Sequence, residues 1–138
     1  MERLVDPLAC AARLLLAALF IHEGWQKIGA YADIAGYMQA HGVPGQLLPL
    51  VILTELGGGL LVAVGLATRA SAFALAGFCV LAALIFHAAS GDGEQLIQLE
   101  KNIAIAGGFL ALTAFGAGRW SLDAWLAGVL GSGKRRAD

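Results

Sequence analysis

Long apolar runs are the feature that most limits what this chain can fold into. Four stretches of the sequence, at about 8–28, 47–66, 70–89 and 96–117, have the roughly 20 mainly apolar residues that a helix needs to cross a bilayer. They are rich in leucine and alanine and lack the two-residue alternation of a barrel strand. Charged residues are only 14 % of the chain, too few to cover a small soluble domain. The sequence therefore predicts an all-α integral membrane protein, with residues 1–138 forming one four-helix bundle.

The charge and cysteine content excludes several other classes of protein. Ten acidic and nine basic residues give a net charge of −1, so the chain lacks the positive charge of a nucleic-acid-binding domain. Its two cysteines, Cys10 and Cys79, are too few for a disulfide scaffold and lack CxxC spacing. We therefore expect the lipid bilayer to be the chain's main partner and expect no contact with nucleic acid.

Shorter segments have the pattern of helices that lie at the membrane surface. Residues 30–39 place apolar side chains at helical spacing directly after the first predicted span. After the last span, Ser121 can cap a helix over about 121–130. Only a very short connection around Thr68 and Arg69 separates the second span from the third, which predicts a tight helical hairpin.

The basic residues are divided unequally between the two sides of the predicted bundle. Of the nine lysines and arginines, all but Lys27 and Lys101 fall on the side that holds both ends of the chain. Cytoplasmic segments of membrane proteins carry an excess of basic residues. The sequence therefore predicts that the N- and C-termini are both cytoplasmic.

Polar residues interrupt the apolar spans mainly toward the opposite, outer side. An ionisable side chain at membrane depth costs about 2.5–3.5 kcal/mol on insertion scales, so such residues usually face the protein interior and serve a function. We expect the four spans to bring theirs together in one polar pocket in the outer half of the bundle. The candidates are Glu55 and His87 as catalytic, proton-exchanging residues, and His22, Glu23, Lys27, Lys101 and Asn102 as ligand-binding residues.

Structural interpretations of these residues stay open beside the functional ones. Glu23 and Lys27 are four residues apart, in the order that favours a local ion pair at the membrane edge. Glu55 is either half of a buried pair with a lysine of a neighbouring helix, or an acid that handles protons or contacts a ligand. His22 and His87 could ligate one haem iron. For His87 we instead expect hydrogen bonding, proton exchange or a plain interfacial position, and we predict no metal site.

Several short motifs occur together over roughly residues 8–126. They are Phe20-x-x-x-Gly24-x-x-Lys27, Glu55-x-x-Gly58, Gly65-x-x-Thr-Arg69, a histidine near the close of the third helix, and Gly116-Ala-Gly-Arg-Trp-Ser-Leu-Asp123. In these motifs the chain resembles the DoxX family, and the last motif is the most specific of them. Glu23 departs from the family pattern, in which an uncharged or histidine-like residue precedes the glycine.

The resemblance implies a four-helix, multi-pass protein of the bacterial inner (plasma) membrane. It further implies an oxidoreductase component, a membrane subunit of a quinone-linked or thiol- and oxidant-stress redox system whose polar pocket holds a quinone head group. Glu55 or His87 would then exchange protons, and the ligand-binding residues would bond the carbonyl oxygens. The sequence shows no flavin, haem, iron–sulfur or nicotinamide motif. We therefore expect no intrinsic cofactor beyond a bound quinone, and electrons from a partner subunit without which the chain is inactive.

A charged pocket at membrane depth also fits a protein that is not an enzyme. A small-solute carrier needs such a pocket, and a membrane scaffold would use the bundle to recruit a soluble partner. Four spans without an inverted repeat make a small transporter, so a carrier would have to form a homo-oligomer. The occupant of the pocket, a redox-active lipid or a polar solute, distinguishes these alternatives.

Overall fold

The structure is a computed structural model that describes residues 2–89 and 92–134, and it is all-α over these ranges, as predicted. It begins with the long helix α1 (Glu2–Gly29) and the short helix α2 (Tyr31–Ala40). The next helical run changes type along its length, through η1 (Gly45–Leu47), α3 (Leu48–Ile52), the π-helical turn η2 (Leu53–Gly57) and α4 (Gly58–Val64). The remaining elements are α5 (Thr68–Ala82), the π-helical turn η3 (Ala83–His87), α6 (Gly93–Phe115) and α7 (Leu122–Lys134).

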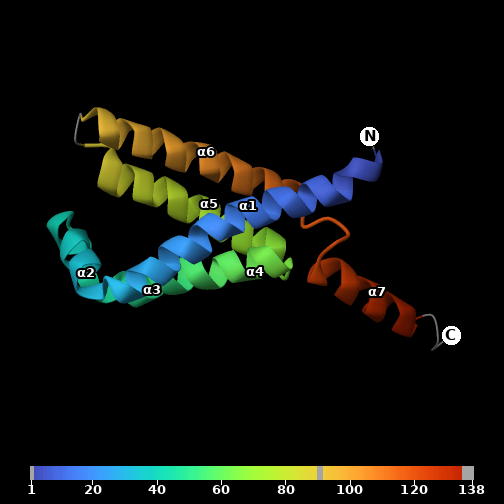
Figure 1. Ribbon diagram of the computed structural model, residues 1–138. Helices are drawn as coiled ribbons and strands as arrows, with labels where there is room; N and C mark the ends of the chain where they lie inside the picture. The colour runs from blue at the N-terminus through green and yellow to red at the C-terminus, as the bar shows by residue number, and fades with distance from the viewer. Residues whose placement is uncertain (1, 90–91, 135–138) are drawn as a thin grey trace.

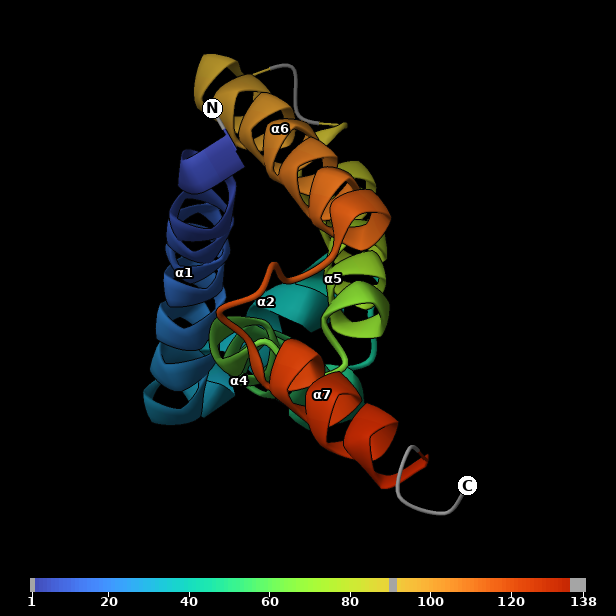
Figure 2. The ribbon, with the colours of Figure 1, turned by 90° about the vertical axis from the view of Figure 1, so that its right-hand side faces the viewer.

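The long helices form two packed pairs. One pair is α1 with α4 and η2, and the other is α5 with α6 (Figure 1). The end-on view shows that the order around the bundle is α1, α4, α5 and α6 (Figure 2). The short helix α2 closes one end of the bundle, and α7 leaves the other end at an angle (Figure 1). These are called the α2 end and the α7 end below.

The core consists of aromatic and small side chains where the two pairs meet. Phe20 of α1 and Phe109 of α6 pack edge to face with their ring centroids 5.2 Å apart, and Leu75 of α5 is fully buried beside them. A Cβ atom at Gly24 would lie 2.8 Å from the backbone nitrogen of Leu56, so only glycine permits this approach of α1 to η2. Small residues let membrane helices approach closely in this way.

Three helices in the described part of the chain are long and apolar enough to cross a membrane. They are Leu4–Gly29, Gly45–Val64 and Thr68–His87, and they coincide with the first three predicted spans. The fourth predicted span, 96–117, corresponds to α6, whose 23 residues are long enough. Polar residues such as Glu100 and Lys101 make its first half less apolar than the other three. A fourth crossing therefore stays a prediction.

The hairpin between α4 and α5 is tight, as the sequence predicts. Gly65 ends α4 in the left-handed conformation, with φ +71°, and the N–H of Leu66 donates to the carbonyl of Leu61 at 2.9 Å. Ala67 follows with φ +47°, which is rare for a residue with a side chain. The turn therefore contains a strained residue that needs support from elsewhere.

Arg13 fastens the segment after α6 to the body of the bundle. Arg13 is 3 % exposed, and its guanidinium donates hydrogen bonds of 2.8 Å to the carbonyls of Ala117 and Trp120. Gly65 leaves the room for it, because a Cβ there would lie 2.6 Å from Arg13 Nη1. The sequence analysis counted Arg13 only among the basic residues on the side that holds both ends of the chain, and it missed this buried role.

Asp123, at the start of α7, supports the strained hairpin from the other side. Its carboxylate accepts hydrogen bonds from the N–H groups of Ala67 at 2.7 Å and Thr68 at 2.9 Å, and so caps α5. Ser121 caps α7 as predicted, because its hydroxyl oxygen accepts from the Ala124 N–H at 3.2 Å. The family-like motif that ends at Asp123 is thus a structural clamp between α6, α7 and the hairpin.

The environment of Asp123 makes its stabilising effect depend on pH. Partial burial alone would raise the pKa of this carboxyl, but the N–H groups of Thr68 and Ala67, with the charge of Arg13, outweigh it and hold the pKa below the ordinary 3.8. A carboxylate whose pKa is lower in the folded than in the unfolded state stabilises the fold at neutral pH. That contribution is lost as the pH falls through the folded-state pKa.

We therefore expect Asp123→Ala to lower the free energy of unfolding by about 1–2 kcal/mol near neutral pH, because α5 loses its cap. Thermal unfolding of parent and variant in detergent, followed by circular dichroism, measures this difference. The gap in Tm should narrow as the pH is lowered from neutral to a value below the folded-state pKa of Asp123, where the parent carboxyl becomes protonated as well. A gap of equal size at both pH values would contradict the charge-assisted cap.

Candidate functional site

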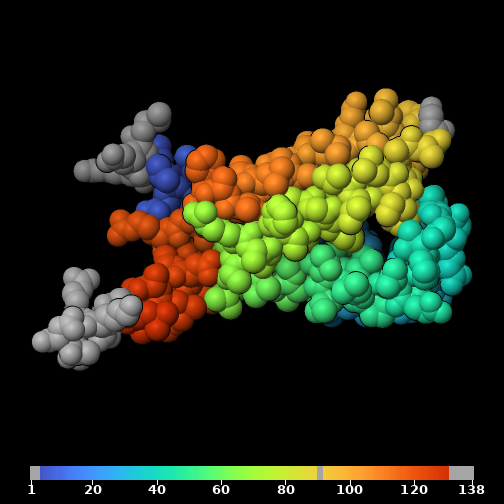
Figure 3. All heavy atoms as spheres, turned by 180° about the vertical axis from the view of Figure 1, so that it is seen from behind, coloured from blue at the N-terminus to red at the C-terminus, as the bar shows by residue number. Residues whose placement is uncertain are grey.

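A cavity of about 510 Å³ lies between the two helix pairs, near the α2 end. Most of its lining is apolar, and it draws on every helical segment from α1 to α6 except α4 and η1. From behind, the surface is hollowed between α2 and η3 (Figure 3). Polar side chains gather on this lining, and they are Glu23, Lys27, Tyr37, Glu55, His87, Gln98, Lys101 and Asn102.

Lys27 lies between two carboxylates on the α1 side of the cavity. Its Nζ is 3.2 Å from Glu23 Oε2, and 3.1 Å and 2.9 Å from Glu55 Oε1 and Oε2. The contact to Oε1 has the geometry of a hydrogen bond, whereas the contact to Oε2 is an ionic approach only. Glu55 therefore pairs with a lysine of a neighbouring helix, one of the two possibilities that the sequence left open. Glu23, Lys27 and Glu55 are called the carboxylate–lysine cluster below.

Burial makes this ion pair necessary for an ionised Glu55. The Glu55 side chain is 5 % exposed, and a lone carboxylate at such a position would lose most of its hydration without compensation. Lys27, at 17 % exposure, supplies the opposite charge within direct contact. The cluster therefore places charge inside an otherwise apolar bundle at a tolerable cost.

Two π-helical turns each contribute a polar residue to the lining of this cavity. Glu55 lies in the middle of η2, and His87 is the last residue of η3. Both residues line the cavity. Single π-helical turns inside α-helices are rare and occur frequently at functional sites. The sequence predicts ordinary α-helices at both places, because hydrophobic periodicity does not resolve one widened turn.

The opposite wall of the cavity comes from η3 and α6. His87 Nδ1 lies 2.6 Å from Gln95 Oε1, which joins the end of η3 to the first turn of α6. Asn102 Nδ2 donates to the carbonyl of Gln98, on its own helix, at 2.9 Å. Lys101 lines the cavity with an exposed side chain. The sequence analysis missed Gln95 and Gln98, although their spacing from Asn102 follows one face of a helix.

Aromatic rings line the side of the cavity next to α2. Tyr37 of α2 stacks on Phe86 of η3, with ring centroids 5.5 Å apart and an interplanar angle of 24°. The ring of His41 packs against both of them, with its centroid 4.3 Å from that of Tyr37 and 5.3 Å from that of Phe86. Tyr37 and Phe86 therefore connect two elements that are distant in the sequence, and both residues line the cavity.

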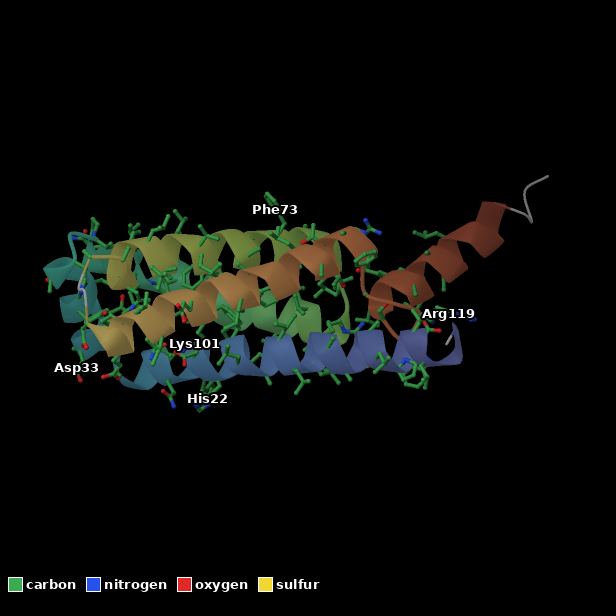
Figure 4. All side chains as sticks on the ribbon, turned by 90° about the horizontal axis from the view of Figure 1, so that it is seen from above. His22, Asp33, Phe73, Lys101 and Arg119 are labelled. Atoms are coloured by element: carbon green, nitrogen blue, oxygen red, sulfur yellow. The ribbon has the colours of Figure 1, made fainter. Side chains whose placement is uncertain are left out.

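All of the predicted site residues except His22 line the cavity. His22 is exposed, and its side chain points away from α1 (Figure 4). Its Nε2 lies 2.8 Å from Gln26 Nε2. The other six come from α1, η2, η3 and α6, as the prediction of converging spans requires. Within the described ranges no three His, Cys, Asp or Glu side chains are grouped as they would be to hold a metal ion.

Comparison with known proteins gives the chain its family. The DoxX family model matches residues 8–88, from α1 to just beyond η3. The chain is also 46 % identical over 123 residues to inner membrane protein YqjF of Escherichia coli (strain K12), which covers 89 % of this chain and 95 % of that protein. The chain belongs to the DoxX family.

A further relative agrees with this assignment. Inner membrane protein YphA of Escherichia coli (strain K12) is 32 % identical over 119 residues, covering 81 % of this chain and 85 % of that protein. No solved structure matches the chain. Both relatives are inner membrane proteins, and this DoxX protein, with its apolar membrane-length helices, is one as well. The residues matched by the DoxX model contain the carboxylate–lysine cluster and His87, whereas Lys101 and Asn102 lie beyond them.

Proposed function

We propose that this DoxX protein is the membrane subunit of a quinone-linked or thiol- and oxidant-stress redox system, and that its cavity holds a quinone head group. One observation carries the proposal. The cavity combines apolar walls with polar side chains that converge from separate helices, and its volume of about 510 Å³ is that of a small-molecule site. Electrons are delivered by a partner redox protein, so the isolated chain turns over slowly or not at all.

The lining suits a quinone in shape and polarity. Phe20, Phe78 and Phe86 supply aromatic walls for a planar ring. Lys101 supplies N–H donors for a carbonyl oxygen, and the Asn102 amide has a second N–H beyond the one bonded to Gln98. A bound quinone supplies the redox chemistry, because it accepts electrons together with protons.

Glu55 and His87 are the residues proposed to exchange those protons. With the Gln95 oxygen as acceptor, His87 carries its proton on Nδ1, which leaves Nε2 as a proton acceptor. Glu55 lines the same cavity in contact with Lys27. The two groups lie on different helices, so they flank the space for the ligand from two sides.

The test of the quinone proposal is the occupant of the cavity. The full chain is purified in mild detergent and extracted with organic solvent, and the extract is examined by mass spectrometry and absorption spectroscopy. We expect a stoichiometric quinone in the parent protein. Lys101→Met should lower the quinone content about ten-fold at limiting quinone, because a charged hydrogen bond to the ligand is lost.

His22→Ala is the matched control, because His22 lies on α1 outside the cavity. It should keep the quinone content of the parent. An empty cavity, or an equal loss in the His22 variant, would contradict the quinone proposal. A polar solute in the extract would instead favour the carrier, and a soluble protein that copurifies with an empty chain would favour the scaffold.

We also propose that both termini are cytoplasmic and that the cavity lies in the outer half of the bundle. Arg13 is buried at the α7 end, where it binds the carbonyls of Ala117 and Trp120, Arg69 lies beside Gly116, and Arg119 belongs to the same segment. Asp33 of α2 and Arg119 lie at opposite ends of the molecule (Figure 4). A basic end of this kind is typical of the cytoplasmic side.

Cysteine labelling in intact cells tests this orientation. In a background with Cys10→Ser and Cys79→Ala, Asp33→Cys should react with a membrane-impermeant maleimide, because the exposed Asp33 position faces outward. Arg119→Cys should react only after the cells are opened. In intact cells, labelling of Arg119→Cys without labelling of Asp33→Cys would contradict the orientation, whereas labelling at both positions would contradict a crossing by α6.

A further inference from the structure

We propose that the carboxylate–lysine cluster is a proton relay, in which Glu23 is the outer group that exchanges protons between the cavity and water at the α2 end. The relay deepens the proposed function, because it states how the protons of the cavity reach the outside. It assigns Glu23 a role that sequence reasoning did not give it. The relay can be tested by a protonation rate that is measured without any quinone.

Exposure rises in one direction along the cluster. The side chain of Glu55 is 5 % exposed, that of Lys27 is 17 % exposed and that of Glu23 is 47 % exposed. Glu23 also lies only about 9 Å of helix rise from the end of α1 at Gly29. The three groups therefore lead from a buried carboxylate at the cavity to a half-exposed carboxylate near the end of α1.

The contacts within the cluster are short enough for direct proton transfer. Lys27 Nζ is 3.1 Å from Glu55 Oε1 and 3.2 Å from Glu23 Oε2, with no gap for a water molecule at either contact. When Glu55 is protonated, its O–H bond breaks and its proton passes to Lys27, while an N–H bond of Lys27 breaks and that proton passes to Glu23. The ammonium is regenerated, Glu55 becomes a carboxylate, and Glu23 becomes a carboxylic acid that releases its proton to water.

Other titratable groups around Glu55 do not form this connection. Cys79 of α5 is fully buried in the core and does not line the cavity. His87 of η3 and Lys101 of α6 belong to the opposite wall, where His87 is bonded to Gln95. In the part of the chain that the structure describes, the Glu55 carboxylate accepts a hydrogen bond from Lys27, and Lys27 also donates one to Glu23.

The test measures how fast the Glu55 carboxyl becomes protonated after a pH jump. The ligand-free full chain in lipid nanodiscs is followed by time-resolved infrared spectroscopy, and the carboxylic acid band of Glu55 is assigned by its absence in Glu55→Gln. We expect Glu23→Gln to slow this protonation about ten-fold or more, because the outer proton acceptor is gone. Glu23→Asp and Glu23→His keep a titratable group, and formate added to Glu23→Gln replaces it, so all three should return most of the lost rate.

Two further variants separate a relay from a structural role. Glu100→Gln removes an exposed carboxylate of α6 that does not line the cavity, and it should leave the rate unchanged. Lys27→Arg keeps a positive charge between the carboxylates, but a guanidinium does not give up its proton, so the rate should fall as in Glu23→Gln. The second variant also keeps the test decisive if Glu23→Gln does not fold.

Parent-like rates in both Glu23→Gln and Lys27→Arg would overturn the relay, because protons would then reach Glu55 through the cavity. The rate is measured without quinone, whereas the occupancy test reads quinone content. A chain that binds quinone but keeps parent-like rates in both Glu23→Gln and Lys27→Arg therefore refutes the relay alone. A chain that binds no quinone but shows the Glu23 effect refutes the quinone proposal alone.

Discussion

The ion pair between Lys27 and Glu55 is the interaction on which the organisation of this bundle depends. A carboxylate that is 5 % exposed inside an apolar helix bundle is tolerable only beside an opposite charge. Lys27 on α1 supplies that charge to η2, which requires α1 and η2 to lie in close contact. Gly24 permits the contact, because a Cβ atom there would collide with the backbone at Leu56. The charged pair, the glycine and the helix pairing are thus parts of one arrangement.

The two ends of the bundle are held together by different means, and this difference places the cavity. At the α7 end, Arg13 and Asp123 bind backbone groups of the loops and fix the hairpin against the start of α7. At the α2 end, the cavity between the helix pairs is lined by the cluster, by η3 and by aromatic rings. These contacts with the loops thus lie at the α7 end, and the site between the helices lies at the α2 end. The motif that ends at Asp123 therefore serves the fold, whereas Lys27, Glu55 and His87 of the other family-like motifs line the cavity.

The sequence predicted the helical class and the convergence of the polar residues, but not their individual contacts. Apolar runs of membrane length and the positions of Glu55, His87 and Lys101 within them are readable in one dimension, and six of the proposed site residues do line one cavity. The outward direction of His22 was not predictable, because one turn of a helix presents residues to both the interior and the lipid. The π-helical turns and the buried tether of Arg13 depend on packing between distant segments, which hydrophobic periodicity does not report.

The most direct test of this account is a distance measurement between Lys27 and Glu55 in a lipid bilayer. Solid-state NMR of the full chain, with ¹⁵N-labelled lysine and ¹³C-labelled glutamate, reports the dipolar coupling between the ammonium nitrogen and the carboxylate carbon. The account predicts a strong coupling, in accord with the 3.1 Å separation of Lys27 Nζ and Glu55 Oε1, and the part due to this pair should disappear in Glu55→Gln. A coupling that is the same with and without Glu55 would show that the pair does not form in the membrane, and would contradict the account of both the bundle and its cavity.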